Sequence, residues 1–241
     1  IGVARAYGVF ALGWRGSLAH WHRHQAAYRL VAALVLPLLL FAQTVVAMEF
    51  AATPVPGWHS ARLPLHMLGT GLPSGLGVVI ALAAVLRLAL GIERWVDDAD
   101  MDLLARLLAS AAAACIMLYV YDLFSGLVLA DAPVRAAYAG RVAAPAYWWA
   151  LGLSAILPQV LWVRRLRVSA WAVVPVGILA SAGVWLDRWS MVVDALGRGG
   201  NGYAPSGNEW QLFAGGTGLF ALALIVFARR VPVVAMVEIR H

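Results

Sequence analysis

Apolar runs about as long as a bilayer is thick recur along this chain. They lie near residues 28–51, 66–90, 103–129, 146–163, 170–193 and 211–229. A helix needs about 20 mainly apolar residues to cross the hydrocarbon core, and lipid offers the backbone no hydrogen-bond partners of its own. Hydrophobic residues make up 63% of the chain and charged residues 12%, whereas about 25% of a soluble domain is charged. The sequence therefore predicts an all-α, polytopic transmembrane helix bundle of about six spans.

The ends of the chain add two expectations. Residues 1–12, IGVARAYGVFAL, are expected to be the end of a preceding span, so that the chain begins inside a larger bundle. Residues 194–210 predict a long loop, and residues 211–229 predict an additional C-terminal span. We expect residues 1–241 to form a single membrane domain, with the main bundle helices over 28–193.

Arginine is unevenly divided between the connections on the two sides of the predicted bundle. All 18 basic residues are arginine; twelve of them fall in one set of connections, five fall in the other, and Arg5 is not assigned to either. The five are Arg62, Arg135, Arg141, Arg188 and Arg198. Cytoplasmic loops of membrane proteins carry the excess of basic residues, so the richer set is predicted to be cytoplasmic. We expect a multi-pass protein of a bacterial inner membrane, with the loop around 131–145 and the loop 194–210 in the periplasm.

The basic balance of the chain favours lipid over nucleic acid as a partner. The formal net charge is +6, and arginines near the inner leaflet attract anionic membrane lipids. Nucleic-acid binding is not expected, because no basic stripe is interleaved with aromatic residues that stack on bases.

The sequence offers little with which to hold a redox cofactor. The single cysteine, Cys115, cannot ligate an iron–sulfur cluster or form an internal disulfide, and it lies in no CxxCH haem-attachment pattern. Residues 197–202, GRGGNG, lack the Lys-Ser/Thr ending of a phosphate-binding loop. The alternating His20, His22 and His24 lie beside arginines and are expected to meet lipid headgroups rather than a metal. We expect no metal site, and any redox cofactors would belong to partner subunits.

Polar and ionisable residues within the predicted spans are the candidate functional residues. Glu49 lies near the outer end of the first complete span, and Gln43 lies six residues earlier, about 120° round the helix. Asp122 lies within the third span, in YVYDLF. Two interpretations stay open for Glu49 and Asp122, because an acid at membrane depth needs either a partner or a function. Each of these two acids is either a protonated structural acid or part of a proton or quinone path.

Two histidines and one ion pair complete the candidates. Asp187 is followed by Arg188 near the outer end of the fifth span, and we interpret them as a structural ion pair between helices. His59, in PGWHS, is expected at the outer interface, in a solvated or structural role. His66 opens the second span and could face a cavity. Haem b needs two buried ligands that face each other, and the sequence predicts no such pair.

Several motifs together resemble a known family. They are the run from Tyr7 through LLLFAQTVVAMEFAATPVPGWHS, PSG at 73–75, PQVLW at 158–162, GVWLDRW at 183–189 and GYAP at 202–205. In order and spacing this chain resembles, from Tyr7 to Tyr203, the C-terminal part of the NrfD/PsrC polysulfide-reductase membrane subunits. Within that family it is most similar to the quinol-oxidising membrane subunit of alternative complex III.

This resemblance implies a function in electron transport. It implies a bundle without a covalently bound cofactor, docked against an iron–sulfur or molybdopterin-like subunit and a multihaem cytochrome c. A quinol, such as menaquinol, would be oxidised near the periplasmic face, and its protons would leave through ionisable side chains. The resemblance implies a quinone site at Gln43, Glu49, His59 and His66, with Glu49 and Asp122 catalytic. At position 43 the family usually has histidine, and glutamine can hydrogen-bond a quinone carbonyl without exchanging a proton.

The resemblance also implies alternatives. The family has an earlier four-helix bundle that supplies much of the quinol pocket, and this chain starts after it. Three alternatives follow for this chain. Another membrane subunit supplies the four-helix bundle, the sequence is part of a longer one, or the quinol pocket has been lost. The chain is then either a quinol-oxidoreductase subunit, with or without proton conduction, or a redox-silent membrane anchor. A transporter is disfavoured because no inverted repeat is found.

Overall fold

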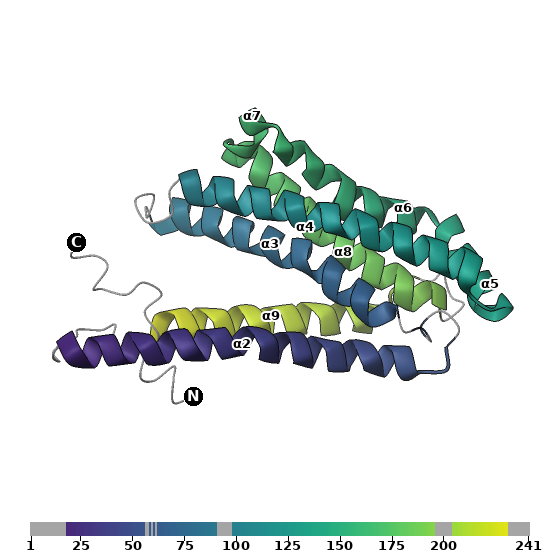
Figure 1. Ribbon diagram of the computed structural model, residues 1–241, viewed down its shortest axis with the longest axis horizontal. Helices are drawn as coiled ribbons and strands as arrows, with labels where there is room; N and C mark the ends of the chain where they lie inside the picture. Colours follow the sequence, from purple (N-terminus) through teal and green to yellow (C-terminus); the bar gives the residue numbers. More distant parts are fainter. Residues whose placement is uncertain are drawn as a thin grey trace. The chain divides into compact units, whose positions relative to one another are not determined.

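The computed structural model describes residues 18–55, 58, 60, 62–90, 98–195 and 204–230. Within these ranges all regular secondary structure is helical, which confirms the predicted all-α fold (Figure 1). The elements are α2 (Leu18–Ala52), α3 (Leu63–Leu90), α4 (Asp98–Phe124), η1 (Ser125–Leu129), α5 (Ala132–Ala143), α6 (Pro145–Leu151), η2 (Gly152–Ile156), η3 (Leu157–Trp162), α7 (Arg164–Arg167), α8 (Ala170–Ala195) and α9 (Gly207–Arg230).

Four segments in this part of the chain are long and apolar enough to cross a membrane. They are Ala33–Ala52, Leu63–Val85, Asp98–Leu129 and Ala170–Val193. They coincide with four of the predicted spans, and the chain is a membrane protein with a helical bundle. The predicted span at 211–229 falls within α9, which is 24 residues long.

The predicted span at 146–163 is helical but differs from a regular α-helix. The backbone changes to a π-helix at Gly152–Ile156 and to a 3-10 helix at Leu157–Trp162. Pro158 has no N–H to donate to the carbonyl of Ser154, so regular α-helical pairing is interrupted there. The π segment also packs closely on α8, because a Cβ atom on Gly183 would lie 2.6 Å from the Ser154 nitrogen.

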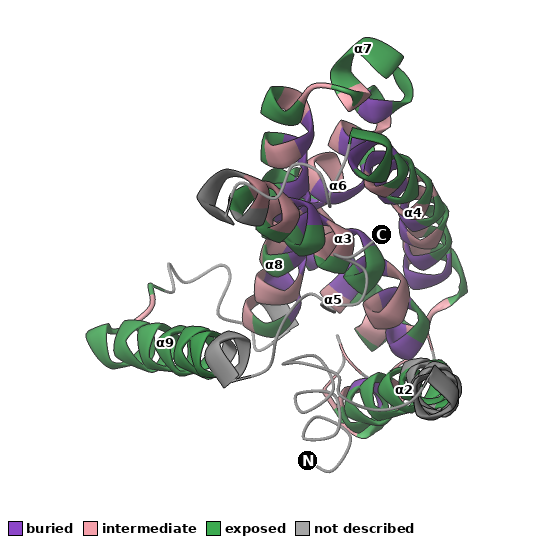
Figure 2. Ribbon diagram, turned by 90° about the vertical axis from the view of Figure 1, so that its left-hand side faces the viewer, coloured by how far each residue is buried: buried purple, intermediate pink, exposed green. Residues whose placement is uncertain are grey.

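The described chain contains two compact units. One comprises Leu38–Tyr203, and the other comprises Ile1–Pro37 together with Ala204–His241. The single domain predicted for residues 1–241 stays a prediction. Within the unit Leu38–Tyr203, helices α3, α4 and α8 lie side by side (Figure 1). Figure 2 shows that their buried residues lie on the faces that these helices turn toward one another.

The core of the unit Leu38–Tyr203 is made of mostly small and aliphatic side chains. It includes Ile80 of α3, Leu108 and Ala109 of α4, and Val173 and Ala180 of α8. Membrane helices associate through close packing of small residues. Lipid tails are as apolar as the side chains, so hydrophobic burial alone does not drive the helices together. The sequence of these helices therefore favours tight packing over bulky interlocking.

Helices α3 and α8 approach each other closely where they cross. A Cβ atom on Gly77 would lie 2.2 Å from the carbonyl oxygen of Gly177. Next to this crossing the Ser181 hydroxyl donates a hydrogen bond of 2.9 Å to the carbonyl of Ser74. Glycine at position 77 lets the two backbones touch, which fixes the relative position of α3 and α8.

Helix α9 begins at a capping box. The Ser206 N–H donates to Oε2 of Glu209 at 2.6 Å, and the Glu209 N–H donates to Oγ of Ser206 at 3.4 Å. These reciprocal bonds satisfy backbone donors that the first helical turn leaves unpaired. They explain why the helix starts at Gly207, ahead of the predicted 211.

Candidate functional site

A buried cluster of ionisable side chains lies at the end of the bundle where α3 starts and where α4 and α8 finish. The first turn of α3 supplies His66, the last turn of α4 supplies Asp122, and the last turns of α8 supply Asp187. Helix α5, which follows α4, adds Tyr138 and Arg141. All five side chains are buried. Under the predicted orientation this end of the bundle faces the periplasm.

Asp187 is the centre of the cluster and is fully buried. Its Oδ1 accepts a hydrogen bond of 2.7 Å from Nη2 of Arg141. Its Oδ2 lies 3.1 Å from Nη1 of Arg188 and 3.1 Å from Nε2 of His66. A carboxylate away from water needs such partners, because removal of its hydration is costly.

Asp122 lies on the other side of the same imidazole. The Tyr138 hydroxyl donates a hydrogen bond to its Oδ2. The same oxygen lies 3.7 Å from Nη1 of Arg141 and 3.9 Å from Nδ1 of His66. Nδ1 has no hydrogen-bond partner among the described residues. His66 therefore has one buried aspartate beside each ring nitrogen.

The cluster is electrically balanced when His66 is neutral. Two guanidinium groups, those of Arg141 and Arg188, then face two carboxylates, those of Asp122 and Asp187. Buried charges in membranes are tolerated when they pair in this way. A proton taken up by the imidazole would add one positive charge between the two carboxylates.

The two residues that α5 adds to the cluster lie outside the membrane spans, and both keep their protons. Burial alone lowers the pKa of Arg141, but the nearby carboxylates of Asp187 and Asp122 and the hydroxyl of Tyr138 outweigh it and raise the pKa above its usual value. Burial, reinforced by the charge of Asp122, raises the pKa of Tyr138 well above its usual range. Arg141 thus stays charged, and Tyr138 stays a hydrogen-bond donor to Asp122.

Aromatic rings close the cluster on one side. The ring of Tyr119 meets the imidazole of His66 edge-on, with centroids 5.0 Å apart. Tyr147 meets Tyr119 in the same manner at 5.9 Å. The guanidinium carbon of Arg141 lies 5.5 Å from the Tyr147 ring centre, at cation–π distance. These aromatic contacts form one side of the cluster.

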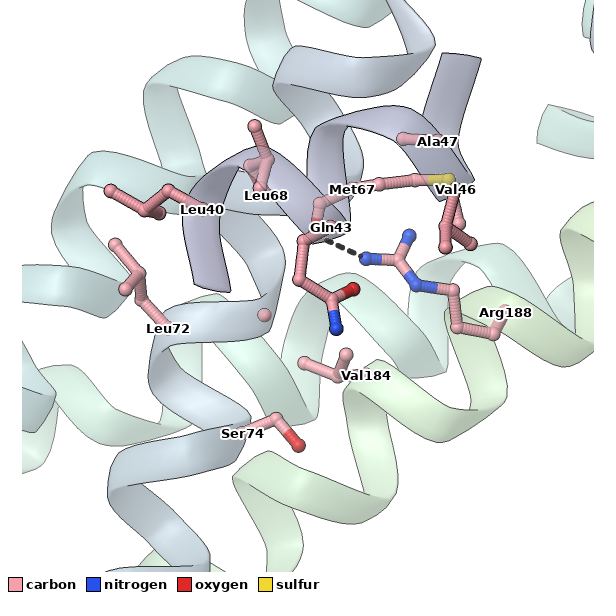
Figure 3. A pocket seen from close by; sticks show the side chains of 11 residues that line it. Leu40, Gln43, Val46, Ala47, Met67, Leu68, Leu72, Ser74, Val184 and Arg188 are labelled. Carbon is pink, nitrogen blue, oxygen red and sulfur yellow. Dashed lines mark hydrogen bonds between the residues drawn. The ribbon is translucent and has the colours of Figure 1, made fainter. Parts of the chain in front are cut away.

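A pocket of about 380 Å³ lies beside the cluster, between α2, α3 and α8 (Figure 3). Its walls are formed by Leu40, Gln43, Val46, Ala47, Met67, Leu68, Gly71, Leu72, Ser74, Val184 and Arg188. Most of these side chains are apolar. Figure 3 shows the amide of Gln43 and the guanidinium of Arg188 directed into the same space.

Arg188 joins this pocket to the buried cluster. Its Nη2 donates to the carbonyl of Met67 at 2.8 Å and to the hydroxyl of Thr70 at 2.6 Å. Its Nη1 pairs with Asp187. Arg188 therefore connects the pocket wall directly to Asp187, the carboxylate that contacts His66.

The structure brings some of the predicted site residues to the cluster or the pocket and leaves others outside them. His66 and Asp122 lie in the buried cluster, and Gln43 lines the pocket. Glu49 is exposed on α2 and belongs neither to the pocket lining nor to the cluster. His59 lies outside the described residues. Catalytic and quinone-binding roles for these residues stay predictions.

The predicted Asp187–Arg188 pair is present, but it is part of a larger network. The sequence did not predict the place of Tyr138 and Arg141 in the cluster, because both lie in the segment 131–145, which the sequence predicts to be a loop between spans. The two residues stand three apart in the otherwise small and apolar AAYAGRVA, which puts them on one face of a helix. That spacing is the signal from which their joint burial could have been predicted.

The sequence matches no protein-family model, and no curated protein matches it. Membership of the NrfD/PsrC family accordingly stays a prediction that rests on the motifs quoted above.

Proposed function

We propose that this chain is a quinone-reactive subunit of an electron-transfer complex in a bacterial inner membrane. In this proposal the pocket between α2, α3 and α8 binds the headgroup of a quinol such as menaquinol. One observation carries it: Arg188 lines the pocket and pairs with Asp187, which contacts an imidazole that has a second buried aspartate on its far side.

The chemistry of the pocket suits a quinone ring. Apolar walls with a few convergent polar groups are typical of small-molecule sites. The Gln43 amide can donate to a quinone carbonyl or accept from a quinol hydroxyl, and so it serves both redox states. Arg188 adds a positive charge that favours the quinol anion formed when the first proton leaves.

The buried cluster offers a route for the protons. Oxidation of one quinol to a quinone releases two electrons and two protons. An imidazole can accept a proton on one ring nitrogen and release one from the other near neutral pH. His66 has Asp187 at 3.1 Å from Nε2 and Asp122 at 3.9 Å from Nδ1. In this proposal each proton moves from the pocket past the Arg188–Asp187 pair to His66 and on to Asp122, toward the side predicted to be periplasmic.

The electrons would leave the chain. We propose that they pass to an iron–sulfur or molybdopterin-like subunit and onward to a multihaem cytochrome c, as the family resemblance implies. Another membrane subunit would cover the exposed face of α2, on which Glu49 lies.

A redox-silent anchor is the second candidate. It is favoured by glutamine rather than histidine at position 43 and by the complete pairing of charges in the cluster when His66 is neutral. An anchor of this kind would use the network only to hold α3, α4, α5 and α8 together.

Substitution of His66 by glutamine separates the two candidates. Glutamine keeps hydrogen-bonding groups but cannot relay a proton. For the purified assembly with His66→Gln, we expect quinol oxidation to fall by about 10²-fold, as for the loss of a general base. Thr44→Val is the control, because this hydroxyl bonds only the Leu40 carbonyl of its own helix in the described structure. Unchanged quinol oxidation in an intact His66→Gln assembly would reject the relay.

A further inference from the structure

A second groove lies at the opposite end of the unit Leu38–Tyr203. Its volume is about 460 Å³, and it is formed by the last turns of α3, the first turn of α4 and the first turns of α8. Helix α3 ends here, whereas α4 and α8 begin here, so all three reach the same end of the bundle. Under the predicted orientation this is the cytoplasmic end. The proposed quinone pocket and proton route do not include any of its residues.

Among the described residues that line it, the groove combines apolar walls with one cation and one anion. Val85 of α3, Met101 of α4 and Val174 of α8 form apolar parts of its wall. Arg87 and Asp98 also line it, and Nη2 of Arg87 donates to Oδ1 of Asp98 at 3.0 Å. The Asp98 side chain is 86% exposed, so this pair stands at the surface of the protein rather than in its core.

A backbone carbonyl adds a second acceptor at the groove. Pro175 lies within α8 and has no N–H, so it cannot donate to the Trp171 carbonyl one turn earlier. Both residues line the groove. The Trp171 side chain is 92% exposed at the first turn of α8, as is typical of tryptophans at the boundary between lipid tails and headgroups.

We propose that this groove binds a phospholipid of the ethanolamine class. The Arg87 guanidinium contacts the lipid phosphate, while the primary ammonium group contacts the Asp98 carboxylate and the Trp171 carbonyl. One acyl chain lies along the apolar wall. The charges match a headgroup that carries one anion and one cation, whereas a headgroup with only negative charge would meet repulsion from Asp98. A choline headgroup has no N–H to donate to either acceptor.

Lipid retention tests this assignment directly. The full chain, purified with any associated subunits in mild detergent, is exchanged with phosphatidylethanolamine, phosphatidylcholine and phosphatidylglycerol of identical acyl chains, and bound lipid is counted by native mass spectrometry. We expect ethanolamine lipid to be retained at least about fivefold over each of the other two, because one additional charge-assisted hydrogen bond strengthens binding by about that factor. Equal retention of the three lipids, or preference for phosphatidylglycerol, would overturn the proposal.

Two variants assign the contacts. Asp98→Asn is expected to abolish the preference for ethanolamine over choline lipid, and Arg87→Gln is expected to reduce retention of both. Arg135→Gln, an exposed change on α5 at the other end of the bundle, is the control and should leave the preference intact. If Asp98→Asn keeps the full preference, or if a partner polypeptide crosslinks to Trp171 in place of lipid, the assignment is wrong. The lipid comparison on the unsubstituted chain decides the matter even when a variant does not fold.

Discussion

At the residue scale, the fully buried Asp187 holds the cluster together. It accepts from Arg141 of α5, from Arg188 of α8 and from His66 of α3, and it therefore links three helices. Removal of one member of a buried ion pair leaves its partner charged and without compensation, which costs more than the pair itself contributes. The cluster is for this reason sensitive to small changes at one position.

Asp187→Asn is expected to lower the free energy of unfolding by about 3–5 kcal/mol, because the buried guanidinium of Arg141 and the partly buried guanidinium of Arg188 lose their shared counter-charge. Unfolding of the purified protein in detergent, followed by circular dichroism, measures the loss. Asp131→Asn is the matched control, since Asp131 is exposed at the start of α5 and should change stability by less than about 0.5 kcal/mol. Equal stability of the two variants would contradict the central place given to Asp187.

Glu49 illustrates what sequence could not decide. Its place in an apolar helix marks it as a candidate catalytic acid, but which face of α2 it occupies relative to α3 and α8 depends on tertiary packing. The structure has it on an exposed face, outside the pocket lining. We expect Glu49→Gln to change quinol oxidation by the purified assembly by less than about twofold, since ordinary surface changes have small effects. A loss of tenfold or more would restore the catalytic interpretation of this acid.

At the element scale, the four apolar helices could be predicted because length and hydropathy are local properties. The π and 3-10 segments between Gly152 and Trp162 could not, because they arise where Pro158 meets close packing against Gly183. The start of α9 could be predicted from Ser206 and Glu209, because these residues stand three apart, as in a capping box. The convergence of His66, Asp122 and Asp187 depends on which helices become neighbours, and spacing along the chain does not contain that information.

The crossing of α3 and α8 gives a prediction at this scale. Gly77→Ala would place a methyl group 2.2 Å from the Gly177 carbonyl oxygen, so the helices must separate. We expect a loss of about 1–3 kcal/mol in the free energy of unfolding, as for other overpacked sites. Gly75→Ala, two residues earlier on the same helix, is the control, because a Cβ atom there meets nothing within 4 Å. Equal stability of the two alanine variants would mean that the helices do not touch at Gly77.

At the scale of the whole molecule, the orientation in the membrane decides what the two grooves can do. The division of arginines predicts that the buried cluster lies near the periplasmic face and that the groove at Arg87 lies near the cytoplasmic face. A proton route toward the periplasm and a lipid site in the inner leaflet both depend on this assignment.

Cysteine labelling in cells checks the orientation. Arg135→Cys on α5 should react with a membrane-impermeant maleimide in intact cells whose outer membrane has been made permeable. Arg165→Cys on α7 should react only after the inner membrane is opened. Cys115 is buried, so the unsubstituted chain should stay unlabelled and provides the baseline. The reverse pattern of labelling would place the cluster on the cytoplasmic side.

The proposed function depends on the occupant of the pocket between α2, α3 and α8. The most direct measurement is a binding titration of the purified assembly with a fluorescent quinol analogue of the hydroxyquinoline N-oxide class. We predict saturable binding at one site per chain, weakened about tenfold or more by Gln43→Leu through the loss of its one hydrogen bond to the headgroup, and unchanged by Thr44→Val. Absence of saturable binding, or equal affinity in Gln43→Leu and the unsubstituted chain, would contradict the proposed quinone site and leave the membrane anchor as the function.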